Sequence, residues 1–437
     1  MVPIPGRGTS GKVNVLLIGG GGREHALAIK IAQSPRIGDF YATHCENPGI
    51  AALCTPVDVP VNIREIYRLQ QFIAKKDINL VVIGPEDPLC EGYADKLANE
   101  HTLVFGPRQQ AAQLEGDKAW SKHMMKAASV PTAEARTFTD ATQAIEYIRS
   151  RQHAPVIKAS GLCKGKGVIV PATIEQAVEA VERMMVKREF GDAGMKVIVE
   201  EKLAGPEVSV LAIVDGKSIL VLPPCQDHKR LLDGDQGPNT GGMGAFCPTS
   251  TITDANMLAI ERQVLVPIID ALRREGIEYQ GVLYAGLMLT PSGPKTLEFN
   301  TRFGDPECQP LMARLRTDLL ELLLATCVGK LDEIEVGWDT RSACCVVLAS
   351  EGYPDKPKTN IPILGLEEAA AMPFVQVLHS GTRRAPNGQI VTAGGRVISV
   401  TALGDTMAQA RERAYAAADK IVFTGKQFRT DIGLKGA

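Results

Sequence analysis

The sequence lacks the features that would tie it to a membrane, to secretion or to nucleic acid. No apolar run among its 437 residues is long enough to span a bilayer, and the first residues lack the apolar core of a secretion signal. The 48 Lys and Arg nearly balance the 50 Asp and Glu, and a formal charge of −2 gives no electrostatic case for nucleic acid or an anionic membrane. We therefore expect a cytoplasmic protein that binds neither, with a disordered Gly- and Pro-rich tail over residues 1–12.

The chain also lacks the cysteine spacing of a metal or disulfide framework. Its ten cysteines include no C-x-x-C pair and no Cys/His cluster, and Cys344 and Cys345 are adjacent within an apolar run. In a long chain without a secretion signal, such cysteines indicate reduced and mostly buried thiols. Zinc and disulfide chemistry are not expected.

Length and periodicity predict several α/β domains. A chain this long exceeds the size at which one hydrophobic core keeps growing. Apolar runs at 13–18, 80–83 and 103–105 alternate with helical patterns, which predicts an open, doubly wound parallel sheet. The predicted division is an N-terminal α/β domain at 13–115, a second domain at 116–338 with a small lid at about 131–204, and an α+β domain at 339–437.

The first glycine-rich loop, Gly19–Gly22, lies where a strand turns into a helix. Glycines there let backbone N–H groups approach an anion, and Arg23 adds a donor. The dinucleotide fingerprint is not met, because Glu24 stands at the third glycine position. A phosphate site and a plain tight turn both remain open.

The second glycine-rich loop, residues 161–167, lies between two predicted strands. It does not match the Walker pattern, because Lys166 replaces the second glycine and a strand follows. Such a hairpin can fold over a triphosphate as a flap, and Lys158 before it can meet a phosphate oxygen. The alternative is a flexible hairpin with solvated lysines.

Further polar groups gather in a strand end and in one long loop. Residues 200–203 end a strand whose backbone can contact an adenine edge, and Glu207 can accept from ribose hydroxyls, although an ordinary turn explains both. The predicted loop at 223–248 contains Asp227, His228 and Lys229 and many glycines, and loops of this length are more often functional than idle.

The run Leu297–Glu307 combines one apolar face with one polar face. Period-two alternation predicts Leu297 and Phe299 on one side of a strand and Glu298, Asn300 and Arg302 on the other. Glu and Asn oxygens suit Mg²⁺, with nucleotide phosphates as further ligands, and Arg302 can neutralise a phosphoryl group in transit. Taken alone, the run fits a polar edge strand equally well.

Together these motifs resemble one family, phosphoribosylamine–glycine ligase of the ATP-grasp superfamily. The resemblance rests on an ordered set of motifs that covers nearly the whole chain after the tail: GGREHA at 21–26, IGPEDPL at 83–89, FGP at 105–107, KASGL and GKGVIV within 158–170, QDHKR at 226–230, GPNTGGMGAF at 237–246, YAGLM at 284–288, LEFNTRFGDPE at 297–307 and GGRV at 394–397.

The resemblance implies an ATP-grasp fold and an ATP-dependent ligase. Glycine would be activated as its acyl phosphate and attacked by the amine of 5-phosphoribosylamine, giving glycinamide ribonucleotide, ADP and phosphate in purine biosynthesis. Such chemistry needs positioning and charge neutralisation, and no protein nucleophile. A monomer is expected.

The resemblance also implies the site residues. Glu298 and Asn300 would bind Mg²⁺ or Mn²⁺, and Arg302, Lys229 and Asp227 would be catalytic. ATP would be held by Lys118, Lys158, Gly161, Lys164, Gly165, Lys166, Gly167, Glu200, Glu201, Leu203 and Glu207. Glycine and the ribosyl amine would be held by Gly21, Gly22, Arg23, Pro85, Glu86, Asn239, Thr240, Gly241, Gly242 and Asp305.

Three alternatives differ in testable ways. A dehydrogenase on the N-terminal sheet would need the missing third glycine and would leave Glu298 and Asn300 without a role. Another ATP-grasp carboxylate–amine ligase would share the ATP residues but take other substrates. A non-catalytic nucleotide-binding relative is disfavoured by the intact Glu298, Asn300 and Arg302. The chain departs from the usual family residues at Cys45-Glu46, 355–357, Ala393 and Thr430.

Overall fold

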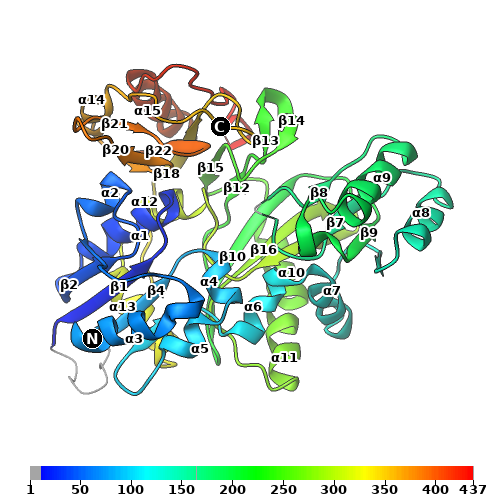
Figure 1. Ribbon diagram of the computed structural model, residues 1–437, viewed down its shortest axis with the longest axis horizontal. Coiled ribbons are helices and arrows are strands. Elements are labelled where there is room, and N and C mark those ends of the chain that lie inside the picture. The colour runs from blue at the N-terminus through cyan, green and yellow to red at the C-terminus, as the bar shows by residue number, and fades with distance from the viewer. Residues whose placement is uncertain (1–10, 164, 437) are drawn as a thin grey trace.

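The N-terminal part of the chain is an open parallel sheet with helices on its faces (Figure 1). The computed structural model describes residues 11–163 and 165–436, so residues 1–10 of the predicted tail and Lys164 lie outside the described residues. Five parallel strands follow the order β3-β2-β1-β4-β5, which confirms the doubly wound prediction. The elements are β1 (Val13–Ile18), α1 (Gly22–Ala32), β2 (Ile37–Ala42), α2 (Pro48–Ala51), β3 (Thr55–Pro56), α3 (Ile66–Lys75), β4 (Leu80–Ile83), α4 (Glu86–Cys90), α5 (Tyr93–Leu97), β5 (Leu103–Phe105) and α6 (Gln109–Gly116).

This sheet brings two predicted site segments together at one edge. β1 and β4 are parallel neighbours, so their carboxyl ends lie side by side. The loop after β1 leads into α1 and the loop after β4 leads into α4, which begins at Glu86. Ligands of open α/β sheets bind outside the carboxyl ends of the strands. At the amino end, the described Gly11 and Lys12 contact Arg36 and Pro35.

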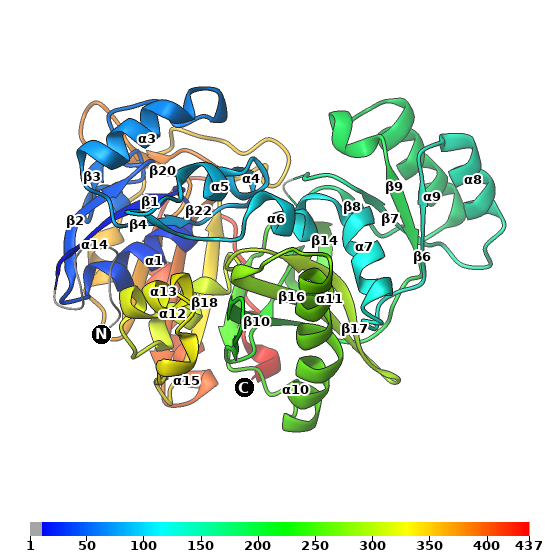
Figure 2. The same ribbon diagram turned by 90° about the horizontal axis from the view of Figure 1, so that it is seen from below.

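The lid is a small antiparallel sheet that projects from one end of the molecule (Figures 1 and 2). Its strand order is β6-β9-β7-β8, and the second glycine-rich loop joins β7 to β8 as the predicted hairpin. Two helices cover the sheet. The elements are β6 (Ala135–Phe138), α8 (Ala141–Arg149), β7 (Val156–Ala159), β8 (Val168–Ile169), α9 (Ile174–Val181) and β9 (Val197–Glu200).

A four-stranded sheet, β11-β10-β16-β17, lies between the lid and the rest of the molecule, and its last strand carries the start of the run Leu297–Glu307. Its elements and the helices around it are α7 (Lys118–Ala127), β10 (Glu207–Asp215), β11 (Ile219–Val221), α10 (Asp254–Ile260), α11 (Val266–Arg274), β16 (Gln280–Thr290), β17 (Gly293–Asn300), α12 (Cys308–Arg314) and α13 (Leu319–Cys327).

The predicted alternation along this run is wrong in two places. Gly286 pairs with Glu298 while Leu287 pairs with Thr296, so Leu297 is the extra residue of a β-bulge. Phe299 is buried in the core, whereas Leu297 is half-buried. β17 also ends at Asn300, so Arg302 lies on the loop beyond the strand.

The C-terminal sheet takes strands from a segment that we expected to be one long loop. Its order is β12-β15-β18-β22-β19, and β12 and β15 lie within 223–248. Short, Gly- and Pro-interrupted strands gave too weak a period to be recognised. The boundary at 338/339 stays a prediction, because this sheet draws on both sides of it. The elements are β12 (Gln226–Asp227), β13 (Arg230–Leu232), β14 (Gln236–Asn239), β15 (Gly244–Cys247), β18 (Ser342–Ala349), α14 (Leu366–Ala370), β19 (Val375–His379), β20 (Thr382–Arg384), β21 (Ile390–Thr392), β22 (Arg396–Gly404) and α15 (Met407–Lys420).

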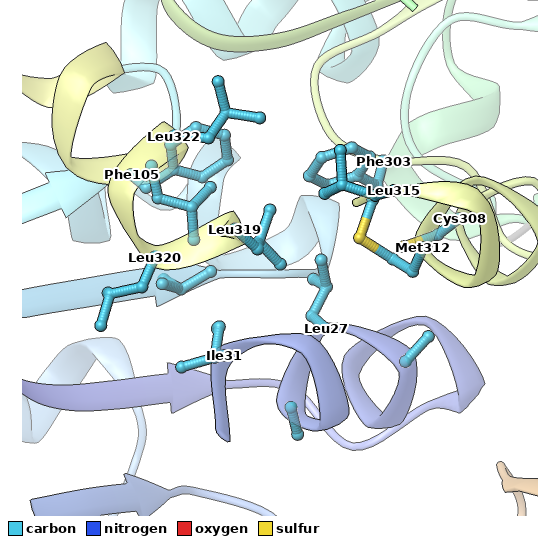
Figure 3. Packing of buried hydrophobic residues seen from close by; sticks show 14 of the residues in the cluster. Leu27, Ile31, Phe105, Phe303, Cys308, Met312, Leu315, Leu319, Leu320 and Leu322 are labelled. Carbon is cyan, nitrogen blue, oxygen red and sulfur yellow. The ribbon is translucent and has the colours of Figure 1, made fainter. Parts of the chain in front are cut away.

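One hydrophobic core joins the N-terminal sheet to the end of the second domain. Figure 3 shows Leu27 and Ile31 of α1 facing Leu319 and Leu320 of α13, and Phe105 beside them. Close packing of this kind resists relative motion, so the two domains support the site as one body. No helix in the described part of the chain is long and apolar enough to cross a membrane. All ten cysteines are described and free, and each is buried or half-buried, which agrees with the burial that we expected.

Candidate active site

Glu298 lies at the centre of the candidate site, with cations on several sides. Its Oε1 atom is 3.9 Å from Lys229 Nζ, which is also 3.4 Å from Glu207 Oε2. Burial raises the pKa of Glu298, but the charges of Lys229, Lys158, Lys118 and Arg302 outweigh burial and lower it. Glu298 is therefore an anionic oxygen donor held near four cations.

Asn300 and Arg302 extend this centre toward the N-terminal domain. Arg302 donates from Nη2 to Asn300 Oδ1 at 3.4 Å, and the same nitrogen is 2.8 Å from Glu115 Oε1. Its Nε donates to Glu86 Oε2 at 3.2 Å. Burial raises the pKa of Glu86, but Arg302 and Arg23 lower it to about 2. Two carboxylates from the N-terminal domain thus hold Arg302, with its side chain only 16% exposed.

A lysine-rich cluster lies on the lid side. Both carboxylate oxygens of Glu200 are paired, with Lys158 Nζ at 2.6 Å and with Lys122. Lys158 also donates to the carbonyl of Leu297 at 3.0 Å, the residue that the bulge leaves unpaired. Lys118 donates to the carbonyl of Gly161 in the second glycine-rich loop at 3.2 Å. The bulge therefore ties the lid to the strand that carries Glu298.

The first glycine-rich loop is built into its surroundings. The N–H of Gly21 donates to Glu24 Oε2 at 2.7 Å, and Arg23 Nε lies 2.5 Å from Glu24 Oε1. Arg23 also donates to the carbonyl of Phe303 at 3.0 Å. Asn47 donates from Nδ2 to the carbonyls of Gly20 and His379, both at 2.8 Å. Three parts of the chain therefore fix this loop.

The segment Asn239–Gly242 and Asp305 meet at Arg396. Arg396 donates to the carbonyl of Gly241 at 2.7 Å and to that of Asp305 at 2.6 Å, and its Nη2 is 3.2 Å from Asp305 Oδ2. The N–H of Gly241 donates to the hydroxyl of Tyr353 at 2.9 Å. The C-terminal domain thus fixes this wall of the site.

Two carboxylates, the buried Glu307 and the half-buried Asp227, lie close enough behind the same wall for the charge of Glu307 to act on Asp227. Glu307 Oε1 accepts from Tyr284 at 2.6 Å and from Ser209 at 3.0 Å. Asp227 Oδ1 is buried and has no hydrogen-bond partner among the described residues. Burial, and then the charge of Glu307, raise the pKa of Asp227 well above its ordinary value.

The second glycine-rich loop reaches across to the Asn239–Gly242 segment. A Cβ on Gly165 would lie 3.7 Å from the carbonyl oxygen of Thr240. Thr240 in turn donates from N and from Oγ1 to the carbonyl of Lys229, both at 2.8 Å. The lid loop therefore faces the strand ends that carry the proposed catalytic cation.

The structure brings most of the predicted site residues together, but not all of them. Glu201 pairs with Lys295 at 3.0 Å at the margin of the lid, and Leu203 lies in the loop before β10. Lys166 is exposed, and Lys164 lies outside the described residues. The contacts of the described residues therefore support the inner set more than Glu201 and Leu203.

Sequence reasoning missed four residues of the site. Lys122 and Glu115 lie on helices with ordinary surface-like patterns, and only the fold brings them to Glu200 and Arg302. Tyr353 follows a glycine in an irregular segment. Arg396 could have been found, because it ends the Gly394-Gly395-Arg396 motif, but nothing in the sequence predicted its contact with Asp305.

Comparison with family models matches the chain in three consecutive pieces. They are the N domain of phosphoribosylglycinamide synthetase over residues 13–115, its ATP-grasp (A) domain over 116–308 and its C domain over 343–435.

Individual relatives agree with the family models. A phosphoribosylamine–glycine ligase from Rhodopirellula baltica is 47% identical over 432 residues, 97% of this chain and 98% of its own length. One from Yersinia pestis is 46% identical over 424 residues, 97% of this chain and 99% of its own. The crystal structure of phosphoribosylamine–glycine ligase from Thermotoga maritima superimposes with a TM-score of 0.83 at 32% identity, covering 96% of this chain and all of that one.

Proposed function

The chain belongs to the phosphoribosylamine–glycine ligase family, and from this membership we propose how its residues perform the reaction. It is an ATP-dependent carbon–nitrogen ligase of purine biosynthesis that joins glycine to 5-phosphoribosylamine. The products are glycinamide ribonucleotide, ADP and phosphate.

In the first step, a glycine carboxylate oxygen attacks the γ-phosphorus of ATP, and ADP leaves. Lys229 lies 3.9 Å from Glu298, the charge of Arg302 also acts on Glu298, and both cations would carry positive charge toward the transferring phosphoryl group. Preorganised cations in a partly dehydrated site stabilise such a transition state without reorganising. The observation that carries the proposal is this arrangement of Lys229 and Arg302 around Glu298.

Glu298 and Asn300 are the proposed ligands of a divalent metal, Mg²⁺ or Mn²⁺. The described residues contain no cluster of three His, Cys, Asp or Glu side chains that could hold an ion alone. One anionic carboxylate and one amide oxygen nevertheless fit the usual mode for Mg²⁺, in which substrate phosphates and water complete the ligands. When bound, the metal would neutralise phosphate charge.

The lid side is proposed to hold ATP. The ATP phosphates, next to the metal at Glu298, would be bound by Lys118, Lys158 and the described residues of the loop at 161–167. The nucleoside would be bound by the end of β9 and by Glu207. Support comes from the contacts of Lys158 with Glu200 and with the carbonyl of Leu297, the residue before the proposed metal ligand Glu298.

In the second step, the amine of 5-phosphoribosylamine attacks the acyl carbon of glycyl phosphate, and phosphate leaves. We place the two substrates between the first glycine-rich loop with Arg23, the Pro85-Glu86 turn, the Asn239–Gly242 segment and Asp305. Asp227 completes this end, because its buried Oδ1 has no partner among the described residues and lies 2.8 Å from where a Cβ of Gly242 would stand. A substrate amine can supply the missing hydrogen bond.

Omission of single components tests the function. Purified protein with Mg²⁺, ATP, glycine and 5-phosphoribosylamine should release ADP, and leaving out any one of them should stop the release. ADP formation that does not depend on glycine or on the ribosyl amine would refute the assignment of substrates.

The proposal also includes a cytoplasmic monomer without nucleic acid or membrane partners. The formal charge of −2 supports the absence of a polyanion partner. Sedimentation of the purified protein at several concentrations checks the monomer: a mass that rises to a multiple of 46.9 kDa would contradict it.

A further inference from the structure

A two-stranded hairpin carries two parts of the proposed site at its base. β13 begins immediately after Lys229, and β14 ends at Asn239, where the segment to Gly242 starts. The strands pair through Arg230 with Asn239 and Leu232 with Gln236. Thr240 donates hydrogen bonds to the carbonyl of Lys229, so the position of the hairpin sets the position of Lys229 and of the Asn239–Gly242 segment.

The tip of this hairpin is exposed and is held by the C-terminal segment of the chain, residues 429–435. Figure 1 shows β13 and β14 beside the C-terminal end. Asp233 Oδ1 accepts from the N–H of Thr430 at 2.8 Å, and the N–H of Gly234 donates to Asp431 Oδ2 at 2.9 Å. Lys435 Nζ lies 2.8 Å from Asp235 Oδ2. We call this set of contacts the C-terminal clasp.

Arg429 is the centre of the clasp, and its side chain is 0% exposed. Its Nε and Nη2 donate to the two oxygens of Asp431 at 2.7 and 2.6 Å. Its Nη1 donates to Asp235 Oδ1 at 2.9 Å and to the carbonyl of Arg230 at 3.2 Å. A buried guanidinium is stabilising only with complete, well-aligned partners, and two of these four hydrogen bonds go to the hairpin.

We propose that Arg429 is a positioning residue for the ligase reaction. Through Asp235 and the Arg230 carbonyl it fixes the hairpin, and through the hairpin it fixes Lys229 and the Asn239–Gly242 segment. It touches no substrate. The inference rests on the proposed function, because Lys229 and this segment matter only if they act on the transferring phosphoryl group and the substrates.

The positioning role can be measured, because ATP and the other two substrates are proposed to bind to different parts of the site. The residues proposed for ATP lie on the lid, at Lys118 of α7 and at Glu207 of β10, and they are not part of the clasp. Of these, Glu207 lies 3.4 Å from Lys229, whereas Lys229 itself and Asn239–Gly242 follow directly from the hairpin. Loss of the clasp should therefore lower kcat and raise KM for glycine and 5-phosphoribosylamine, while the affinity for ADP, measured by calorimetry, should stay within about twofold. Misplacement of catalytic groups by about 1 Å costs up to roughly 100-fold in rate.

Three variants and one matched control test the role. Arg429→Met removes every clasp contact of the guanidinium and should lower kcat/KM for both substrates roughly 10- to 100-fold. Arg429→Lys keeps the charge without the fork, and Asp235→Asn weakens only the hairpin side, so both should fall between Arg429→Met and the wild type. Arg341→Met is the control, because Arg341 makes the same two-nitrogen contact to a carboxylate two residues away, Asp339, without touching the hairpin. It should keep wild-type kinetics.

The outcomes separate this inference from the proposed function. A wild type that releases ADP without glycine or ribosyl amine refutes the function itself. A wild type that needs both, with folded Arg429→Lys and Asp235→Asn variants at wild-type kcat and KM, refutes the positioning role alone. The role is also refuted if ADP affinity falls by the same factor as kcat/KM for glycine and kcat/KM for 5-phosphoribosylamine, because general destabilisation of the fold would explain that pattern. If Arg429→Met does not fold, the two milder variants decide.

Discussion

The two glycine-rich loops look alike in the sequence, but Gly19 of the first and Gly165 of the second differ in the space around them. A Cβ on Gly19 would lie 2.7 Å from Glu24 Cγ and 2.8 Å from Pro85 Cδ, at a φ of +119°. A Cβ on Gly165 would find nothing closer than the Thr240 carbonyl at 3.7 Å, at a φ of +79°. Gly19 is both crowded and at a positive φ, whereas Gly165 needs glycine for its backbone conformation alone. Elsewhere in the second loop a Cβ on Gly161 would lie 2.8 Å from Ala193 and one on Gly167 2.7 Å from Cys163 Sγ, so only the part at Gly165 is open.

The difference indicates two mechanical roles. The first loop is fixed by Glu24, Asn47 and Arg23 and joins three parts of the chain, as a preformed substrate site requires. The second is a hairpin of the lid that faces the Asn239–Gly242 segment across ordinary contact distances, as a closing flap requires. Four predictions test this contrast.

The largest effect is expected where both loops depend on the same residue. Glu298 lies near lysines of the lid side and near Arg302, which reaches the N-terminal domain. Glu298→Gln removes the anionic ligand and should lower kcat by roughly 100-fold or more. The fold should stay intact, because the amide has the same shape. Steady-state ADP release measures the effect, and Glu333→Gln, an exposed carboxylate paired with Lys330, is the control. Near-normal turnover of Glu298→Gln would remove Glu298 from the metal site.

Gly19→Ala should give the next largest effect. Crowding against Glu24 and Pro85 adds to the backbone strain, and together they should lower the stability of the N-terminal domain by about 2–5 kcal/mol. Gly388→Ala separates the two causes, because Gly388 has a φ of +85° with nothing within 4 Å, and it should lose only about 1 kcal/mol. Thermal unfolding of both variants provides the measurement. Equal losses would show that crowding at the first loop adds nothing.

The same contrast explains how much of the site the sequence could predict. Glycine content located both loops, and the strand–glycine–helix order placed the first at the end of β1, because such signals are local. The alternation along 297–302 failed at Leu297, because the bulge there depends on the pairing of β17 with β16, and at Arg302, because β17 ends at Asn300. Glu115, Lys122 and Arg396 were missed, because their partners are distant in sequence and only the assembled domains bring them to Arg302, Glu200 and Asp305.

Acid should loosen the first loop before the second. Burial, and then the nearby His379, lower the pKa of His25 to about 3, and His25 Nδ1 accepts from the N–H of His379 at 2.8 Å. Between the ordinary pKa of 6.5 and about 3 the unfolded state binds a proton that the folded state does not. Stability is therefore complete above pH 6.5 and falls below it, by up to roughly 1.4 kcal/mol per pH unit.

Hydrogen exchange from pH 7 to 4.5, corrected for the intrinsic pH dependence of exchange, checks this prediction. Protection of residues 19–33 should fall with acid, and His25→Gln should flatten the fall. Residues 158–170 contain no histidine and serve as the internal control. A pH-independent protection of residues 19–33, or an equal fall in both segments, would contradict the assignment to His25.

Gly165→Ala is expected to change stability least, but it should still lower kcat measurably. No atom blocks the new methyl group, so the cost is the left-handed backbone alone, about 1 kcal/mol, and it is confined to the lid. Relief of that strain would shift the loop from Thr240, so kcat should fall several-fold through a less complete closure.

Gly191→Ala is the matched control in the same lid, because Gly191 has a φ of +56° and nothing within 4 Å. If the two variants lose the same stability but only Gly165→Ala loses turnover, the second loop acts by its conformation over the site. If both keep wild-type kcat, the closing role is wrong and only the first loop is needed in its observed shape.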